Sequence, residues 1–185
     1  MQVRHLSLDG VVEIIPAKAG DARGFFSETW SRQRFVDRGL TQDWVQDNQS
    51  LSAEKGTLRG LHFQVRPFAQ DKLIRVLKGS IFDVAVDLRK ASPTYGKWAS
   101  CVLSPEAFNQ LLVPKGFAHG FLTLEPSTEV FYKVSAPYSP QCDRAIRYDD
   151  PAIAIDWPLA GAMPVLSAKD RGAPLLSEIA ASIEF

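Results

Sequence analysis

Short runs of apolar residues that alternate with polar ones recur along the whole chain, and turn signals separate them. These runs are rich in β-branched and aromatic side chains and are too short for amphipathic helices, so they predict strands. Lys78-Gly79 stands between two of the runs and predicts a tight hairpin. The predicted strands are 11–15, 44–52, 57–65, 72–77, 80–88, 97–103, 110–113, 116–124 and 128–134.

The run 80–88 shows the alternation most clearly. One face is apolar at positions 82, 84, 86 and 88, whereas the other face carries Asp83 and Asp87 among apolar residues. This pattern predicts a strand in a sheet with one face in the core.

Helical signals are few and short. Ser31 is a candidate N-cap for a helix that runs through Arg38 and ends at Gly39, and a second short helix is predicted from Pro174 to about Ala181. Many short strands with Gly and Pro turns and few helices predict an all-β fold, either a sandwich, a jelly roll or an antiparallel barrel.

Composition restricts the functional classes. A length of 185 residues fits one domain spanning 1–185. Lys plus Arg equals Asp plus Glu, so no global charge indicates nucleic acid or an anionic membrane as a partner. No apolar run is long enough to span a bilayer. Cys101 and Cys142 form no CxxC pair, and the expected compartment is the reducing cytoplasm.

His62 is the first candidate for chemistry, within Arg59-Gly-Leu-His-Phe-Gln. A strand histidine can be a core residue or a general base, and the strand alone leaves both open. Arg59 favours a functional site over a core histidine, because a buried arginine needs an anionic partner. The planar guanidinium group of an arginine is also well suited to bind phosphate. Strict alternation puts Arg59 and His62 on opposite faces, but a bulge at Gly60 would re-aim one of them.

The segment Pro114-Lys-Gly116-Phe-Ala-His119 resembles the second conserved box of cupin barrels, in which the histidine is often a metal ligand. The first cupin box usually has His-x-His followed by glutamate, whereas this chain has His62-Phe-Gln64 and no glutamate before Gly79. Two histidines without a carboxylate are a poor set for a catalytic metal, so we expect a cupin-shaped pocket without metal.

Three further regions are ambiguous from the residues alone. Tyr132 shares a strand face with Val130 and Val134, so it can be a core tyrosine with its hydroxyl at the rim as well as a functional residue. Asp170 ends a Ser/Lys/Asp stretch that is typical of a solvated loop. The segment 21–28 places Arg23 and Glu28 around two aromatic residues, which suits a nucleotide but also an ordinary surface loop.

Taken together, these segments resemble dTDP-4-dehydrorhamnose 3,5-epimerases. The matching motifs extend from about Asp21 to Asp170 in the family's order: ARGFFSE, VQDNQS, GTLRGLHFQ, AQDKLIRVLKGSIFDVAVDLR, SPTYGKW, PKGFAHGF, FYK and LSAKD. The resemblance implies a cupin-type antiparallel β-barrel (jelly roll) with a few short helices, usually a homodimer. It implies inversion of carbons 3 and 5 of dTDP-4-dehydro-6-deoxy-D-glucose without cofactor or metal.

The resemblance also implies residue roles. His62 is the expected base, Asp170 its orienting carboxylate, Lys72 the stabiliser of the enolate, and Tyr132 the acid on the far face of the sugar. The expected substrate-binding residues are Arg23, Phe26, Glu28, Gln46, Asn48, Arg59, Lys72, His119, Tyr138, Asp143 and Lys169. Some of the contacts to the nucleotide would come from the N-terminal segment of the neighbouring subunit. Asp143 stands where the family more often has glutamate.

Three alternatives stay open at this stage. A relative that epimerises only carbon 3, or that acts on another nucleotide-linked keto sugar, would keep the same base and often the same tyrosine. A non-catalytic sugar-binding cupin would be expected to lose one of His62, Lys72, Tyr132 or Asp170, and this chain has all four. A metal-dependent cupin oxygenase would need the missing ligands.

Overall fold

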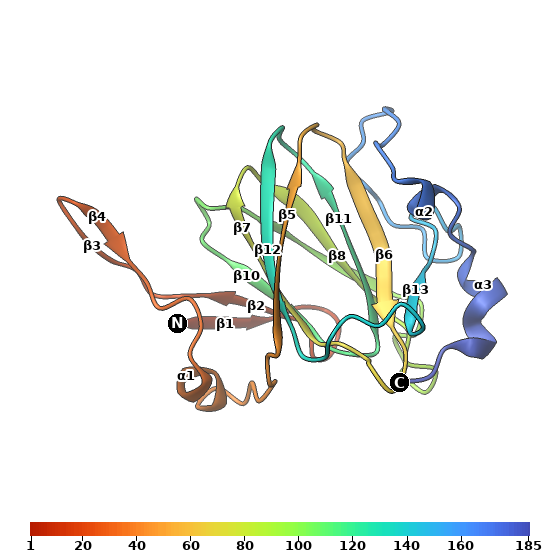
Figure 1. Ribbon diagram of the computed structural model, residues 1–185, viewed down its shortest axis with the longest axis horizontal. Coiled ribbons are helices and arrows are strands. Elements are labelled where there is room, and N and C mark those ends of the chain that lie inside the picture. The colour runs from red at the N-terminus through yellow and green to blue at the C-terminus, as the bar shows by residue number, and fades with distance from the viewer.

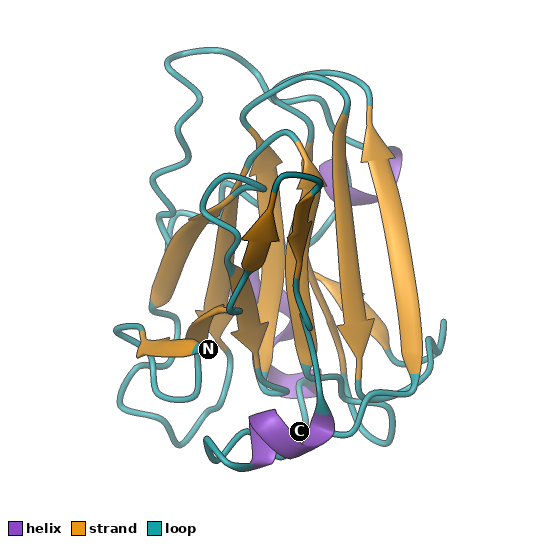
Figure 2. Ribbon diagram, turned by 90° about the vertical axis from the view of Figure 1, so that its left-hand side faces the viewer, coloured by secondary structure: helices purple, strands orange, loops and turns teal.

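Two antiparallel β-sheets face each other and form the body of the protein in the computed structural model, which describes all 185 residues (Figures 1 and 2). The larger sheet has six strands, in the order β1 (Gln2–His5), β2 (Val12–Ile15), β10 (Gln110–Val113), β7 (Lys72–Lys78), β12 (Thr128–Val134) and β5 (Gln46–Ser52). The smaller sheet has five, in the order β13 (Asp143–Ala145), β6 (Leu58–Gln64), β11 (Phe117–Thr123), β8 (Ile81–Asp87) and β9 (Trp98–Leu103).

The remaining elements are short. A separate hairpin pairs β3 (Ala19–Asp21) with β4 (Gly24–Phe26) and projects away from the two sheets (Figure 1). The helices are α1 (Arg32–Val36), α2 (Ala168–Arg171), α3 (Leu176–Ile179) and the 3-10 turn Ala180–Ser182. None of them has the length and apolar character needed to cross a membrane.

Most of the predicted elements are confirmed. Each of the nine predicted strands is present, with ends that differ by at most two residues from the observed ones. The two predicted helices are present but shorter, and Ser31 precedes α1 without a capping hydrogen bond from its side chain. Strands β1, β3, β4 and β13 and helix α2 were not predicted.

Apolar side chains pack in three layers rather than one. One cluster fills the space between the sheets and includes Ile74, Ile81 and Val130. A second lies between the five-stranded sheet and the C-terminal segment, and it joins Val84 to Trp157. A third packs residues around helix α1 against the outer face of the six-stranded sheet. The five-stranded sheet is therefore covered on both faces, whereas the outer face of the six-stranded sheet is covered around β2, β7 and β10 and left open along β5.

This layering corrects the prediction for strand β8, for which the sequence indicated a single buried face. The wholly apolar face packs against the C-terminal segment, and the mixed face lies between the two sheets. Asp83 and Asp87 are consequently fully buried, at 0% exposure. Both faces are buried because the C-terminal segment covers the side that would otherwise meet solvent.

The predicted irregularity in β6 is present at Gly60. The pairing of β6 with β11 shifts register between His62 and Arg59. Gly60 has φ +142°, and a Cβ atom at this position would lie 2.5 Å from the Cα of Gly120. Only glycine fits such a close approach of two backbones. As a result, Arg59 and His62 line the same hollow instead of pointing to opposite faces.

Candidate functional site

Polar side chains from both sheets line a cleft between them. The cleft consists of two adjoining hollows of about 200 and 210 Å³, and His62, Lys72 and Tyr132 line both. The first hollow adds Gln46, Asn48, Tyr138, Asp143 and Lys169. The second adds Arg59, His119 and Asp170. Eleven of the fourteen predicted site residues therefore meet here, although they come from six strands, one helix and one loop.

His62 and Asp170 form a hydrogen-bonded pair across 108 positions of sequence. Nε2 of His62 lies 2.5 Å from Oδ1 of Asp170, which leaves Nδ1 of the ring for a ligand. Asp170 is held in turn by the hydroxyl of Ser167, which donates to its Oδ2 at 2.7 Å and caps helix α2 by accepting from its backbone N–H at 3.1 Å. The expected contact between His62 and Asp170 is therefore present, and such a carboxylate can hold an imidazole in one orientation.

The environment of Asp170 favours its charged form. Burial by itself would raise the pKa of this carboxyl, but hydrogen bonds from His62 and Ser167 and the charges of His62 and Lys169 hold the pKa below its ordinary value. The side chain of Asp170 is only 4% exposed, whereas that of His62 is 30% exposed to the cleft. The pair therefore combines a buried anion with an accessible base.

Lys72 brings a buried ammonium group to the cleft from the opposite sheet. Its Nζ donates to the backbone oxygen of His62 at 3.2 Å, so the side chain reaches across to strand β6. Burial lowers the pKa of Lys72 to about 8, although the carboxylates of Asp143 and Asp83 favour the charged form. A cation close to the base can stabilise a negatively charged intermediate.

Tyr132 stands on the six-stranded sheet, with the ring partly buried between Val130 and Val134, as the sequence predicted. Burial raises the pKa of its hydroxyl, with Arg59 acting in the other direction, so the phenol stays protonated at neutral pH. His62 and Tyr132 belong to different sheets and line the same hollow. A ligand in the cleft can meet an imidazole on one side and a phenol on the other.

A second histidine–carboxylate pair lies beside the first. His119 and His62 are paired residues on the neighbouring strands β11 and β6. Nε2 of His119 lies 2.5 Å from Oδ1 of Asp83, whose Oδ2 is buried without a hydrogen-bond partner. His119 was a predicted site residue, whereas Asp83 was not.

Gln64 occupies the position where cupins usually have their second histidine. Its amide nitrogen donates to the backbone oxygens of Phe68 at 2.6 Å and Pro137 at 3.1 Å, and its oxygen accepts from the backbone N–H of Ser139 at 2.7 Å. These three hydrogen bonds use both ends of the amide group to hold two loops in place. The chain contains no cluster of three or more His, Cys, Asp or Glu side chains placed to hold a metal ion.

The mouth of the first hollow is a hydrogen-bonded rim. Asp143 forms an ion pair with Lys169 and accepts from the hydroxyl of Tyr138 at 3.2 Å. Gln46 accepts from the backbone N–H of Tyr138 at 3.1 Å and donates to Asn48 at 2.8 Å. The loop that carries Tyr138 is therefore anchored from both sheets, while the ring itself is 58% exposed.

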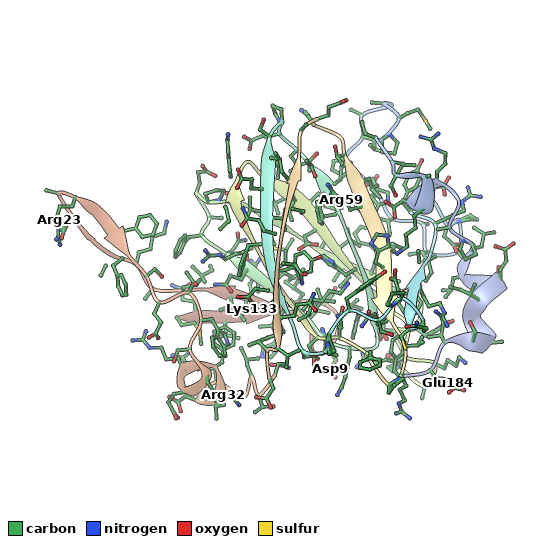
Figure 3. All side chains as sticks on the ribbon, in the orientation of Figure 1. Asp9, Arg23, Arg32, Arg59, Lys133 and Glu184 are labelled. Carbon is green, nitrogen blue, oxygen red and sulfur yellow. The ribbon has the colours of Figure 1, made fainter.

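Arg59 lies at the rim of the second hollow (Figure 3). Its guanidinium donates to the hydroxyl of Ser52 at 3.2 Å and to the backbone oxygen of Leu51 at 3.1 Å. Neither partner is an anion, so the arginine keeps its charge available for an anionic ligand.

Three predicted residues lie outside the cleft. Arg23 is at the tip of the hairpin (Figure 3) and pairs with Asp21, and Phe26 is 74% exposed. Glu28 forms an ion pair with Arg34 at 2.9 Å. These residues line none of the hollows around His62, so a single chain does not bring them to the base.

Sequence reasoning missed several residues of the cleft. Gln64, Gln70 and Ser50 line it, and Asp83 lies directly behind His119. The acidic residues on the mixed face of 80–88 were the available signal for Asp83. That signal could be used only with knowledge of which face of the strand is inside.

Comparisons with known proteins agree on one family. The family model described as dTDP-4-dehydrorhamnose 3,5-epimerase matches residues 5–178. The protein of that name from Sinorhizobium fredii is 53% identical, over 100% of this chain and 94% of the relative. The crystal structure of dTDP-4-dehydrorhamnose 3,5-epimerase from Bacillus anthracis with TDP and PPi bound has a TM-score of 0.91 and 49% identity, over 95% of this chain and 99% of that one. A dTDP-6-deoxy-D-glucose-3,5-epimerase from Legionella pneumophila, solved with dTDP-4-keto-L-rhamnose, has a TM-score of 0.93 and 44% identity, over 100% and 98%.

Proposed function

Because the chain belongs to the dTDP-4-dehydrorhamnose 3,5-epimerase family, as its motifs predicted, we propose that it is an isomerase that converts dTDP-4-dehydro-6-deoxy-D-glucose into dTDP-4-dehydro-L-rhamnose. The observation that carries the proposal is the cleft itself. A carboxylate-held histidine and a protonated tyrosine come from opposite sheets, and a buried lysine lies beside the histidine.

The reaction needs three kinds of group. Carbons 3 and 5 flank the ketone at carbon 4, so a side-chain base can remove their protons and form an enolate. The enolate oxygen must then be stabilised by a cation or a hydrogen-bond donor. A proton delivered to the opposite face of the ring completes each inversion.

His62 is the proposed base. Its Nδ1 is free to accept the proton, and the imidazolium that forms is stabilised by Asp170 through Nε2. Asp170 keeps its negative charge because its pKa is held below the ordinary value, so it favours the protonated ring. The side chain of Asp170 is almost fully buried, whereas the imidazole of His62 is exposed to the cleft.

Lys72 and Tyr132 supply the other two functions. The ammonium of Lys72 is close to the backbone of His62, where the enolate oxygen would develop its charge. Tyr132 is the proposed acid, because burial raises the pKa of its hydroxyl and keeps it protonated. No group other than these side chains is required for proton removal, charge stabilisation and proton return.

The nucleotide end of the substrate is proposed to bind at the rim and to involve a second copy of the chain. Arg59, Asp143, Lys169 and Tyr138 offer charge and an exposed aromatic ring beside the base. The hairpin that carries Arg23 and Phe26 projects away from the two sheets (Figure 1) and lines neither hollow around His62. Its exposed aromatic side chains support a homodimer in which the hairpin of one chain completes the site of the other.

The expected cytoplasmic location rests on the cysteines. Cys101 and Cys142 are both buried and carry free thiols, which suits a reducing compartment.

The test is isotope exchange. The purified protein is incubated with dTDP-4-dehydro-6-deoxy-D-glucose in deuterated water, and the product is examined by NMR. Deuterium at carbons 3 and 5 together with the L-configured product is the expected result. Label at carbon 3 alone would identify a 3-epimerase, and no label at either carbon would reject the proposal.

A further inference from the structure

We propose that Asp83 is a positioning residue of this site, which holds His119 in one orientation and adds a buried carboxylate to the surroundings of Lys72. This inference rests on the proposed function, because the role of Lys72 is part of that proposal. Asp83 itself lines neither hollow. Asp83 is a positioning residue and not a catalytic one, since His119 separates it from the cleft.

Asp83 is a buried carboxylate with unused hydrogen-bonding capacity. It is 0% exposed, Oδ1 contacts only Nε2 of His119, and Oδ2 has no hydrogen-bond partner. Burying an unpaired carboxylate oxygen is costly, and such an atom in a native structure calls for an explanation. An electrostatic role in the cleft explains this atom, because a carboxylate that is not neutralised by its direct contacts acts on the groups around it.

Asp87, on the same face of the same strand, shows what a purely structural carboxylate looks like here. It is also 0% exposed, but it accepts hydrogen bonds from the guanidinium of Arg89 at 2.8 and 2.9 Å. The hydroxyls of Ser92 and Thr94 each donate to it at 2.6 Å. These partners neutralise Asp87 locally, and neither it nor any of them lines the hollows around His62.

The contacts of Asp83 lead towards the cleft instead. His119 is paired with His62 across strands β11 and β6, and Lys72 donates to the backbone oxygen of His62. The ionisable groups around Lys72 are Arg59, His62, His119, Tyr132, Tyr138, Asp83, Asp143, Lys169 and Asp170. Asp143 is already paired with Lys169 at the rim, whereas Asp83 is paired with no lysine or arginine and contacts only His119.

Two consequences follow for the chemistry. A carboxylate at Nε2 requires a proton on that nitrogen of His119, so Nδ1 of the neutral ring is left as an acceptor. Burial lowers the pKa of Lys72 to about 8, and the negative charge of Asp83 opposes this effect. Without that charge the pKa falls further, and the lysine loses its proton at a lower pH. The enolate would then lack its cation in the alkaline part of the working range.

The primary test measures Lys72 directly and needs no turnover. The ammonium is titrated by NMR in protein labelled with 13C at the lysine ε-carbon, in wild type, Asp83→Asn and Asp87→Asn, and Lys72→Arg identifies the resonance. We expect a midpoint near 8 in wild type and a fall of about one pH unit in Asp83→Asn, the size expected for a nearby charge. Asp87→Asn should lower the melting temperature and leave the midpoint in place. An unchanged midpoint in folded Asp83→Asn would overturn the inference.

The same shift should appear in catalysis. In Asp83→Asn, the pH at which kcat declines on the alkaline side should fall together with the midpoint of the Lys72 titration. At pH values above the pKa of Lys72 in both proteins, kcat should therefore be about tenfold lower than in wild type. In a Lys72→Arg background the limb from Lys72 is absent, because arginine stays charged, and adding Asp83→Asn should then produce no shift. An equal loss in both backgrounds at every pH would show that Asp83 has only a structural role.

The wild-type protein supplies a test that holds even if Asp83→Asn does not fold. In 15N spectra of histidine-labelled protein, with His119→Asn as the assignment control, His119 should carry its proton on Nε2. A proton on Nδ1 would show that Asp83 does not orient the ring. Failure of the proposed function would appear separately, as a wild-type protein that titrates as expected but exchanges no deuterium into the sugar.

Discussion

The cleft and the N-terminal hairpin contrast sharply in how their functional residues are supported. In the cleft, nearly every polar side chain has a partner from a different element, as His62 has in Asp170. In the hairpin, Arg23 contacts only its near neighbour Asp21, and Phe26 is 74% exposed. The residues are equally suited to binding, but only those of the cleft are fixed by the fold of a single chain.

The difference separates two sources of preorganisation. The side chains of a site built on paired strands are positioned when the sheets form, so the free energy that orients them comes from folding. A hairpin with few packing contacts gains its orientation only from what it binds. Substitutions in the cleft should therefore affect the chemical step, whereas substitutions in the hairpin should affect substrate affinity and depend on the second chain.

The largest effect is expected from His62→Asn. Asparagine cannot accept the proton at neutral pH, so exchange at both carbons should fall by about 10⁴-fold while nucleotide binding persists. Isotope incorporation and calorimetric binding of dTDP measure the two properties. The control is His5→Asn, at an exposed histidine on β1, which should behave like wild type. Normal exchange in His62→Asn would remove this residue from the mechanism.

Tyr132→Phe should divide the reaction into its halves. The ring still packs between Val130 and Val134, so the melting temperature should change little. With His62 and Lys72 intact, some deuterium exchange should remain, but the doubly inverted product should fall by about 10²–10⁴-fold. Tyr148→Phe, in the layer beneath the C-terminal segment, is the matched control. Formation of the L-sugar at close to the parent rate would make Tyr132 a structural residue.

Arg23→Ala tests the hairpin. Loss of a charged hydrogen bond to the nucleotide should raise KM by about 10- to 100-fold with a much smaller change in kcat. Arg38→Ala, at an exposed arginine after helix α1, is the control.

Mixing chains decides which site the hairpin serves. Arg23→Ala and His62→Asn chains are each impaired, but a mixed dimer with exchanged hairpins has one site free of both changes. Activity should therefore reappear on mixing under conditions that allow subunit exchange. If each hairpin served its own cleft, every site in a mixed dimer would keep one defect and no activity would return.

The smallest effect is expected from chelation. Because Gln64 is committed to two loops and its neighbours form no metal cluster, exhaustive dialysis against a chelator should leave kcat/KM unchanged. Activity that is lost in this way and restored by one divalent ion would contradict the proposed mechanism.

Sequence patterns predicted the sheets well and the site in part. Short apolar runs between turn signals identified nine strands, including β10 and β11, which are buried at every position. The strand Ala19–Asp21 was missed because it has no apolar pattern, and its pairing comes from the turn alone. Asp170 reads as a loop residue, and its burial depends on long-range packing that the local sequence does not show. For the same reason, alternation in β8 could not reveal that its mixed face is the inner one.

The distance in sequence between His62 and Asp170 also has a consequence for the synthesis of the protein. Strand β6 can leave the ribosome and begin to pair long before residue 170 has been translated. The base is oriented only when helix α2, near the end of the chain, packs beside β6. A nascent or truncated chain that ends before this helix would contain the cleft but an unoriented histidine. The return of activity during refolding should therefore report the arrival of the C-terminal segment and lag behind formation of the sheets.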